Sequence, residues 1–504
     1  MKKVDLGKLE EVLPSFLENA RWWIGGVKEY EIVDILEADK GFLLFLKTHD
    51  HLFQLPMVRV EKPRKELITS KRYVEINGEY YVEAEYTPYY FDLMEDLGIN
   101  HEDYTGFAGK IVEAKPLALG TTNVVGLHVL GDGSKLVVKG YRLLAKVNLE
   151  PLMYRELYRR GFKHIPCLHR IYYYELDVKY YLSLVTRYVE GTRDAGYPFY
   201  KALHDYLVKK RKGEKIGIQQ ACLSNLAWRL ARIIADMHIR LNPSSSKEFL
   251  GLEEITSQDI RAWERRIDAK VKFINNTLDK LIDESKGRVK VEYEYWLKKF
   301  NEAHKTITEV KNVLAELFTG TYKGRIHQDL HLQQMIYIPS DNNFIITDFE
   351  GEPGRTDEER LMKEPLIRDL ATTVQSFHYL AFFTYKDVMG GSEKEKNPVI
   401  GFSRIGKKIV KQKNPIIMEW VLRHTIDLAY VYAHVTSKEA IGRDLFNYKY
   451  PLKKMYHVYL APWVIERALY ETVYELTYGG SRSGWFVIPL TAIVNPLLPI
   501  LRLS

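Results

Sequence analysis

Two aspartates bracket a predicted β-hairpin in the segment RIHQDLHLQQMIYIPSDNNFIITDFEGEP (325–353). Asp329 lies in a loop before the first strand, and Asp348 ends the second strand. Phosphoryl transfer from ATP requires one carboxylate that accepts the proton of the acceptor hydroxyl and a different carboxylate that binds Mg²⁺. A hairpin that follows a loop can present both at separate corners of one cleft. We therefore predict Asp329 as the general base and Asp348 as a metal ligand.

A third group in this segment suits the same chemistry. Gln334 stands five residues after Asp329, and its amide oxygen is a hard ligand of the kind that Mg²⁺ prefers. Either aspartate alone could be an ordinary turn, helix-cap or strand-end residue. The pattern His-x-Asp-x-x-x-x-Gln, followed about twenty residues later by Asp-Phe-Glu, is more specific when it closes a chain that begins β-rich and continues helical. We therefore favour a phosphoryl-transfer site.

A candidate phosphate-binding region lies upstream. Lys139 is in the apolar strand-like run KLVVKGY, where one inward-facing cation suits the α- and β-phosphates of ATP. The turn GTTN precedes it, and the backbone amides of Thr121, Thr122 and Asn123 could cover phosphates. A lone strand lysine is more often solvated, and GTTN alone is only a turn. Their order, turn, strand lysine, helix and second hairpin, is the order that a kinase N-lobe requires.

The composition predicts a soluble, cytoplasmic globular protein. The chain has 504 residues, which predicts two or three domains, and its 46% hydrophobic and 28% charged residues can form a large core. The net charge is +7, but the basic residues are spread out, so we predict no nucleic-acid partner. Cys167 and Cys222 form no CxxC motif, which argues against a disulfide framework and a zinc site.

No membrane partner is predicted either. The N-terminal residues lack the apolar run of a signal peptide. The most hydrophobic segment is the C-terminal GWFVIPLTAIVNPLLPILRLS, which three prolines interrupt. We expect this segment to be a buried tail rather than a membrane span.

We predict an α+β fold in three parts, 1–105, 106–190 and 191–504. The first two parts are β-rich, and the third is mostly helical apart from the hairpin described above. The Asp-Gly turn at 131–134 predicts a hairpin in the second part. The strand-like runs of the first part are 41–48, 51–60 and 79–87. The main helical patterns are 149–161, 219–241, 259–285 and 291–318.

Longer stretches of the sequence resemble a known family. They are ENARWWIGG, GTTNVV, RGFKHIPCL, IHQDLHLQQM, DFEGEPGR, EPLIRDLATTVQSFHY, WVIERALYETVYEL and WFVIPL. These stretches, spread over nearly the whole chain, resemble motifs of the maltokinases of the trehalose–glycogen pathway, a branch of the aminoglycoside-phosphotransferase-like kinases. The last three distinguish maltokinase-like proteins from general aminoglycoside kinases, and we expect an archaeal, thermophilic member.

The resemblance implies a bilobal, eukaryotic-protein-kinase-like fold with an additional β-rich N-terminal cap. It implies that ATP and Mg²⁺ are used to convert maltose to maltose 1-phosphate, with trehalose synthase as a partner. Alternatives are a related kinase acting on glucosamine or glucose, and a catalytically silent sugar-binding protein. A protein kinase fits less well, because only about fifteen residues separate Asp-Phe-Glu from the next helical motif, too few for an activation loop.

The resemblance also assigns roles by position. Glu350 is expected near a second metal ion, and the Arg368–Asp369 pair is expected to support the catalytic loop. The partner of Lys139 is predicted to be Glu150, with Glu156 as the alternative. Adenine is expected to contact backbone groups of the hinge Arg187, Tyr188 and Val189. Sugar contacts are assigned to His331, Arg467, Tyr474, Glu475 and Trp485.

A helical face supports the sugar-binding assignment independently. Arg467, Tyr470, Glu471 and Tyr474 are spaced i, i+3, i+4 and i+7, so they share one face of a helix. The alternative is that the tyrosines are core residues and that Trp485 anchors the tail. The sequence departs from the family at Gln328, where glycine is usual. It also departs before Trp485, where GGSRSGW replaces the family's NRPDW, and at 245–300, which resembles an insertion.

Overall fold

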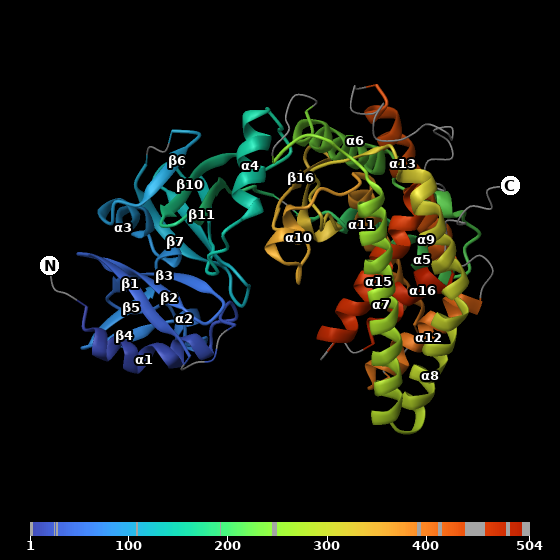
Figure 1. Cartoon of the computed structure of the whole chain (residues 1–504), viewed down its shortest axis with the longest axis horizontal. Helices are drawn as coiled ribbons and strands as arrows, with labels where there is room; N and C mark the ends of the chain where they lie inside the picture. The colour runs from blue at the N-terminus through green and yellow to red at the C-terminus, as the bar shows by residue number, and fades with distance from the viewer. Residues whose placement is uncertain are drawn as a thin grey trace. The chain divides into compact units, whose positions relative to one another are not determined.

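The chain forms two compact units, described here separately (Figure 1). Unit 1 comprises residues 1–190 and 355–361, and unit 2 comprises residues 191–354 and 362–504. The structure is a computed structural model. It describes residues 4–24, 26, 29–106, 109–191, 193–243, 249–390, 395–411, 416–438, 459–479 and 484–495.

The first sheet of unit 1 has an inner strand, β2, that is buried on both faces. The sheet has five antiparallel strands in the order β1-β2-β3-β5-β4. Alternate residues of β2 pack on opposite sides: Leu44 joins a core with helix α1, and Leu43 joins a core with α3 and the second sheet. This double burial explains why β2 reads as an unbroken apolar run. The elements are α1 (Leu6–Glu18), β1 (Glu31–Ala38), β2 (Gly41–Lys47), β3 (Leu52–Val60), α2 (Lys65–Thr69), β4 (Val74–Ile76), β5 (Glu79–Glu83), a 3-10 turn (Ala84–Tyr86) and α3 (Tyr90–Asp96).

The second sheet of unit 1 has six strands in the order β6-β10-β11-β9-β8-β7. The predicted Asp-Gly hairpin joins β8 to β9, and the GTTN turn joins β7 to β8. Asn148 caps the following helix with its side chain, which accepts a hydrogen bond from the Glu150 amide. The elements are β6 (Asn100–Asp103), β7 (Ile111–Ala118), β8 (Val124–Leu130), β9 (Lys135–Gly140), α4 (Leu149–Arg159), β10 (Leu168–Glu175) and β11 (Lys179–Arg187); α10 (Asp357–Leu361) also belongs to this unit.

Unit 2 is a helical body that carries the hairpin β15–β16. A short strand, β12, pairs with β15, and α11 packs against α5, α13 and α15. Helices α7 and α8 pack side by side (Figure 1). The strands are β12 (Arg193–Asp194), β13 (Glu253–Glu254), β14 (Tyr322–Lys323), β15 (Met335–Ile338) and β16 (Asn343–Ile346). The helices are α5 (Tyr197–Arg211), α6 (Ser224–Leu241), α7 (Ser257–Glu284), α8 (Gly287–Glu302), α9 (His304–Phe318), α11 (Ile367–Met389), α12 (Pro398–Lys411), α13 (Ile416–Thr436), α15 (Ala461–Tyr478) and α16 (Val487–Val494), with 3-10 turns at Ile218–Ala221 and Leu332–Gln334.

Some element predictions were wrong. The pattern 291–318 predicted one helix, but the structure has two, α8 and α9, which meet at Ala303. Strand β1 was missed because its residues are mostly exposed or half-buried, so its sequence EIVDILEA lacks a clear apolar face. The C-terminal prediction is confirmed up to residue 495, since α16 is almost wholly buried, and the rest lies outside the described residues. Among the described helices, none is long and apolar enough to cross a membrane.

Candidate active site

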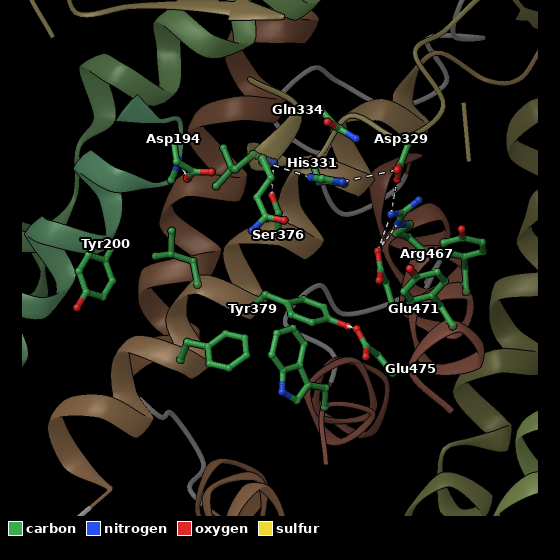
Figure 2. Close-up of a pocket in the computed structure, with 18 of the residues that line it drawn as sticks. Asp194, Tyr200, Asp329, His331, Gln334, Ser376, Tyr379, Arg467, Glu471 and Glu475 are labelled. Atoms are coloured by element: carbon green, nitrogen blue, oxygen red, sulfur yellow. Dashed lines mark hydrogen bonds and ion pairs between the residues drawn. The ribbon is translucent and has the colours of Figure 1, made fainter. Parts of the chain in front are cut away.

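A cavity of about 600 Å³ lies in unit 2 beside the hairpin (Figure 2). Its walls come from the start of α5, the loop before β15, α11 and α15. The residues that line it are Asp194, Gly196, Tyr197, Tyr200, Asp329, His331, Leu332, Gln333, Gln334, Pro353, Ser376, Tyr379, Leu380, Phe383, Arg467, Tyr470, Glu471, Tyr474, Glu475 and Trp485. Asp329 and the predicted sugar-binding residues therefore meet at one cavity, although up to 156 positions separate them in the sequence.

The loop that carries Asp329 is held by Asp369, near the start of α11. The Asp369 carboxylate accepts hydrogen bonds from the backbone amides of His327 and Gln328 at 2.8 and 3.0 Å. His238 of α6 also contacts this carboxylate, at 2.9 Å, and its other ring nitrogen is 2.8 Å from the Tyr432 hydroxyl. Asp369 thus supports the loop, as predicted for the Arg368–Asp369 pair, while Arg368 points to other carboxylates.

Gln328 and Asp348 both adopt left-handed backbone conformations. Their φ angles are +74° and +64°, in the region that glycine occupies most easily. The conformation explains why glycine is usual at position 328 in the family that the sequence resembles. The substitution by glutamine keeps the loop in place at the cost of local backbone strain.

The Asp329 carboxylate is held by one arginine. Oδ1 accepts a hydrogen bond of 2.6 Å from Nη2 of Arg467, and Oδ2 lies 3.6 Å from Nε2 of His331 (Figure 2). Burial raises the pKa of Asp329, whereas the Arg467 guanidinium opposes this rise and Glu352 adds to it. Asp329 is only 6% exposed, so its carboxyl group is largely removed from water, with one oxygen engaged by Arg467.

His331 is a neutral neighbour rather than a cation. Burial, with Arg467 close by, lowers the pKa of His331 to about 4. Its Nδ1 accepts a hydrogen bond of 3.2 Å from the Gln333 amide, which fixes the ring. A neutral imidazole at this place can exchange hydrogen bonds with a hydroxyl group, as the predicted role in sugar binding requires.

The predicted metal ligands lie at one end of the hairpin. Met335 pairs with Ile346, so Gln334 and Asp348 flank the first paired residues of β15 and β16. The Thr347 amide donates a hydrogen bond of 2.9 Å to the Gln334 carbonyl, which holds the two segments together. Gln334, Asp348 and Glu350 are all half-buried and supply an amide and two carboxylate oxygens. This set of hard oxygen donors fits Mg²⁺.

The sugar-binding prediction placed a face of α15 toward the cavity, and the structure places it there. Arg467, Tyr470, Glu471, Tyr474 and Glu475 all line the cavity. Trp485 reaches it from the segment before α16 and packs edge-on against Phe383, with ring centroids 4.8 Å apart. Tyr470, Tyr474 and Trp485 are half-buried at this wall, whereas Arg467 and Glu475 are buried.

Several cavity residues were missed by sequence reasoning. Asp194, Tyr197 and Tyr200 come from β12 and the start of α5, and Tyr379 and Phe383 come from α11. Tyr379 donates a hydrogen bond of 3.5 Å to Glu475. Tyr379 is the last residue of the segment EPLIRDLATTVQSFHY, most of which lies in α11. No local pattern in this segment indicated which side of the helix faces the cavity.

The predicted nucleotide-binding residues lie in unit 1. Lys139 Nζ is 2.7 Å from Glu150 Oε2, and the Tyr141 hydroxyl donates to the same oxygen at 2.9 Å. Glu156 instead contacts Arg155, Arg159 and Arg160. The pairing of Lys139 with Glu150 rather than Glu156 therefore agrees with the geometry.

The turn and the hinge of unit 1 have defined backbone contacts. In the GTTN turn, Gly120 has φ +76° and the Thr121 hydroxyl donates to the Asn123 carbonyl, while Thr122 is exposed. At the predicted hinge, the amides of Arg187 and Tyr188 donate to the carbonyls of Cys167 and Lys135 at 2.8 and 2.9 Å. These two amides therefore already donate hydrogen bonds to other backbone groups. Adenine would have to contact the backbone carbonyls of the hinge or Val189.

Arg467 also stabilises the fold. Its guanidinium is buried and contacts Asp329, Glu352 and Glu471, and these carboxylates raise its pKa although burial opposes the rise. We expect Arg467→Ala to lower the free energy of unfolding by about 3–5 kcal/mol, because it leaves buried carboxylates without their partner. Urea unfolding measures this. The control Arg423→Ala removes an exposed pair with Glu419 and should change stability by less than about 1 kcal/mol; equal losses would contradict the expectation.

Comparison with solved structures identifies the fold. A glucosamine kinase structure aligns over 99% of this chain and 98% of its own, with TM-score 0.63 and 16% identity. A structure of glucosamine kinase in complex with glucosamine, ADP and inorganic phosphate aligns over 99% and 100%, with TM-score 0.61 and 16% identity. The chain shares the fold of these kinases. The predicted α+β, kinase-like fold of two lobes is confirmed by this likeness, which at such identity shows the fold alone. No protein-family model matches the sequence.

Proposed function

We propose that the protein is an ATP-dependent sugar kinase. The observation that carries the proposal is the position of Asp329, a buried carboxylate at the wall of a cavity of about 600 Å³ with Gln334 beside it. Arg467 holds one carboxylate oxygen, so the other can accept the proton of a sugar hydroxyl. The fold shared with a sugar kinase supports the same function.

Each group has a distinct role in this proposal. Asp329 accepts the proton as the hydroxyl oxygen attacks the γ-phosphorus and ADP leaves, and Arg467 keeps the carboxylate oriented. Gln334, Asp348 and Glu350 would hold Mg²⁺, which when bound neutralises charge on the phosphates.

ATP would be bound by groups of unit 1. Lys139, oriented by Glu150, would contact the phosphates, and the backbone around Thr121, Thr122 and Asn123 would cover them. Arg187, Tyr188 and Val189 remain the proposed adenine hinge. We assign the sheet β1–β5 as the cap subdomain, the sheet β6–β11 as the N-lobe and unit 2 as the acceptor-binding lobe. A kinase that depends on ATP would act in the cytoplasm.

Maltose is the leading acceptor in the proposal, with transfer to its anomeric hydroxyl. The cavity has room for a disaccharide, and Tyr470, Tyr474, Tyr379 and Trp485 offer aromatic faces to sugar rings. The motifs of α15 and the segment after it, on which the maltokinase resemblance partly rests, form this wall. A trehalose synthase would be the partner that supplies maltose.

Glucosamine is a second candidate, favoured by the charge of the cavity. Asp194, Glu471 and Glu475 line it together with Asp329, whereas Arg467 is already paired and His331 is neutral. An excess of carboxylates favours an acceptor that carries an ammonium group. Glucosamine is also the sugar in the complex of the structural neighbour.

A panel of acceptors tests these assignments. The protein is incubated with ATP, Mg²⁺ and maltose, glucosamine or glucose; ADP release is measured, and ³¹P NMR locates the phosphate. Sugar-dependent ADP release supports the kinase, and the sugar with the highest kcat/KM identifies the acceptor. Binding of sugar without any phosphorylated product would indicate a catalytically silent protein.

Trp485 provides a test of the sugar-binding wall. Trp485→Ala should raise the KM for the sugar about tenfold and leave the KM for ATP unchanged, because the ring is half-buried at the cavity. Steady-state kinetics measure both constants. Trp228→Ala is the control, since this exposed tryptophan of α6 lies outside the cavity lining. An equal rise in the KM for ATP would show that Trp485 acts through packing.

A further inference from the structure

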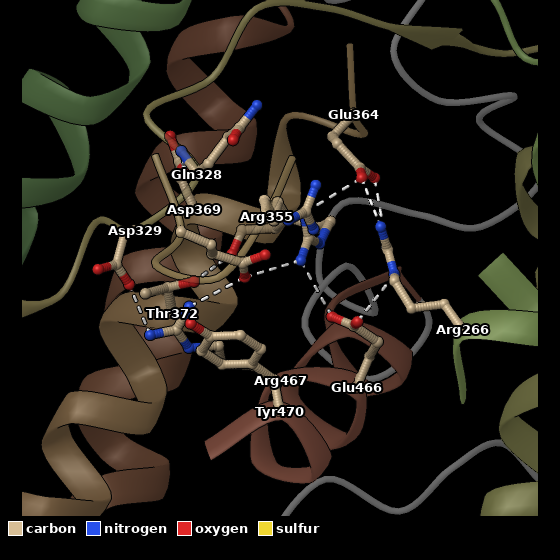
Figure 3. Close-up of polar contacts among 12 residues, drawn as sticks. Arg266, Gln328, Asp329, Arg355, Glu364, Asp369, Thr372, Glu466, Arg467 and Tyr470 are labelled. Carbon is tan, nitrogen blue, oxygen red and sulfur yellow. Dashed lines mark hydrogen bonds and ion pairs between the residues drawn. The ribbon is translucent and has the colours of Figure 1, made fainter. Parts of the chain in front are cut away.

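We propose that helix α7, in the segment that resembles an insertion, supplies positioning residues for Asp329. The inference rests on the kinase function proposed above. Arg266 and Lys270 of α7 would hold Glu466, and through it Arg368, Glu352 and Arg467, in the arrangement that orients the catalytic carboxylate. Figure 3 shows Arg266, Glu466, Arg467 and Asp329.

The first step joins Asp329 to Glu352. Arg467 donates to Asp329 Oδ1 through Nη2 at 2.6 Å and to Glu352 Oε1 through Nη1 at 3.0 Å. A guanidinium is rigid and planar, so fixing one of its ends fixes the direction of the other. Glu352, which is 1% exposed, and Glu471, which accepts a hydrogen bond of 2.8 Å from Nε of Arg467, together set the angle at which Arg467 meets Asp329.

The second step joins Glu352 to Glu466. Arg368 donates through Nη2 to Glu352 Oε1 at 3.0 Å and to Glu466 Oε2 at 3.2 Å. Glu352 Oε1 is thus shared by two arginines. If Arg368 moved toward Glu466, its hydrogen bond to Glu352 would weaken, and the contact of Arg467 with Asp329 would change.

The third step reaches α7. Arg266 Nε lies 3.1 Å from Glu466 Oε1, Lys270 Nζ contacts the same oxygen, and Arg266 also donates to Glu364 at 2.6 Å. Arg266 and Lys270 are four residues apart, so they share one face of the helix. Although burial opposes it, Lys270, Arg368 and Arg266 hold the pKa of Glu466 well below its ordinary value.

Arg266 and Lys270 of α7 therefore neutralise the buried carboxylate of Glu466, close to the candidate active site. Without Lys270, Glu466 would satisfy its carboxylate by drawing on Arg368, because a buried carboxylate that loses a partner is strongly destabilised. Burial lowers the pKa of Lys270 to about 8, and Glu466, whose carboxylate contacts the ammonium, opposes this fall. The chain of contacts links α7 to Asp329 through Glu466, Arg368, Glu352 and Arg467, and of these four only Arg467 lines the cavity.

Kinetics on the full chain test the inference. Lys270→Met should lower kcat about tenfold with the KM for ATP unchanged, because the carboxylate is misplaced but the nucleotide site is not. Lys270→Arg should recover most of the loss. Lys280→Met is the matched control, since Lys280 lies on the same helix but is exposed and pairs only with Glu284 at 3.7 Å. An unchanged kcat in folded Lys270→Met overturns the inference.

A second measurement requires neither catalytic turnover nor the Lys270→Met variant. The pKa of Asp329 is followed in the ligand-free protein by ¹³C NMR of aspartate carboxyls, assigned with Asp329→Asn. Glu352→Gln should lower this pKa, because Glu352 raises it and because Arg467 is then shared by fewer carboxylates. The other groups near Asp329 are His327 and His331 of its loop and Arg467, Tyr470 and Glu471 of α15.

The two measurements separate the two proposals. If the wild-type protein phosphorylates no sugar, the proposed kinase function is wrong. The pKa of Asp329 still shows whether the contact between Arg467 and Asp329 depends on Glu352. An unchanged or raised pKa in Glu352→Gln shows that the ion pairs only stabilise the fold and overturns the positioning role. A lowered pKa, with melting temperature recorded for each variant, supports it.

Discussion

Asp329→Asn should lower kcat by about 10²–10⁴-fold, the range expected for loss of a general base. An amide has nearly the volume of the carboxylate but cannot accept the proton, so the Kd for the sugar should change little. Burial raises the pKa of Asp329 above its ordinary value of 3.8. In the wild-type protein, kcat/KM should therefore fall as the pH drops through this raised pKa, and this limb should disappear in Asp329→Asn.

Two measurements decide this prediction. Steady-state kinetics across pH give kcat and the acid limb, and isothermal titration with the sugar gives the Kd. Asp205→Asn is a suitable control, because Asp205 is an exposed residue of α5 that pairs with Lys201. A kcat close to that of the wild type in Asp329→Asn would show that the proton goes elsewhere and that Asp329 is structural.

Asp348→Asn should sharply raise the Mg²⁺ concentration needed for activity and weaken the binding of MgATP. The substitution replaces a charged oxygen ligand with a neutral one. Asn tolerates left-handed backbone better than most residues, so the φ of +64° at position 348 should be preserved and the fold should remain intact. The substitution should therefore act only by removing the negative charge of the ligand. We expect the half-saturating Mg²⁺ concentration to rise at least tenfold.

Titration of activity with Mg²⁺ at fixed ATP measures this effect. Asp341→Asn provides the control, since Asp341 is exposed in the turn of the same hairpin and its backbone carbonyl, not its side chain, accepts from Arg229. Superimposable Mg²⁺ titrations of wild type and Asp348→Asn would assign Asp348 a structural role.

The chemistry within the hairpin segment could be read from the sequence because it is local. Asp329, Gln334 and Asp348 lie within twenty residues, and the two strands between Gln334 and Asp348 have apolar residues that predict a hairpin. The same holds for Lys139, whose strand and turn are adjacent. The face of α15 could also be predicted, since helical spacing alone places Arg467 and Glu471 together.

The contacts between distant segments could not be read in this way. Arg467 and Asp329 are 138 residues apart, and the sequence suggested only that Arg467 binds sugar. In the structure, the Arg467 guanidinium forms an ion pair with Asp329, the candidate base. Asp194 and Tyr379 reach the cavity from other elements, and nothing near them in the sequence indicates a ligand.

Local patterns in the sequence determined two β-rich parts, a mostly helical third part and the residue types at the candidate base and metal positions, because hairpins, strand lysines and helical faces are local features. The kinase-like fold was implied by the resemblance to a known family. Only the tertiary structure decided which buried carboxylates contact which arginines and lysines. Arg368 and Asp369, adjacent in sequence, bind different partners, and Glu466 joins α7 to α11. The physical reason is that buried ions must be paired by whichever groups packing brings within reach, and packing depends on the whole chain.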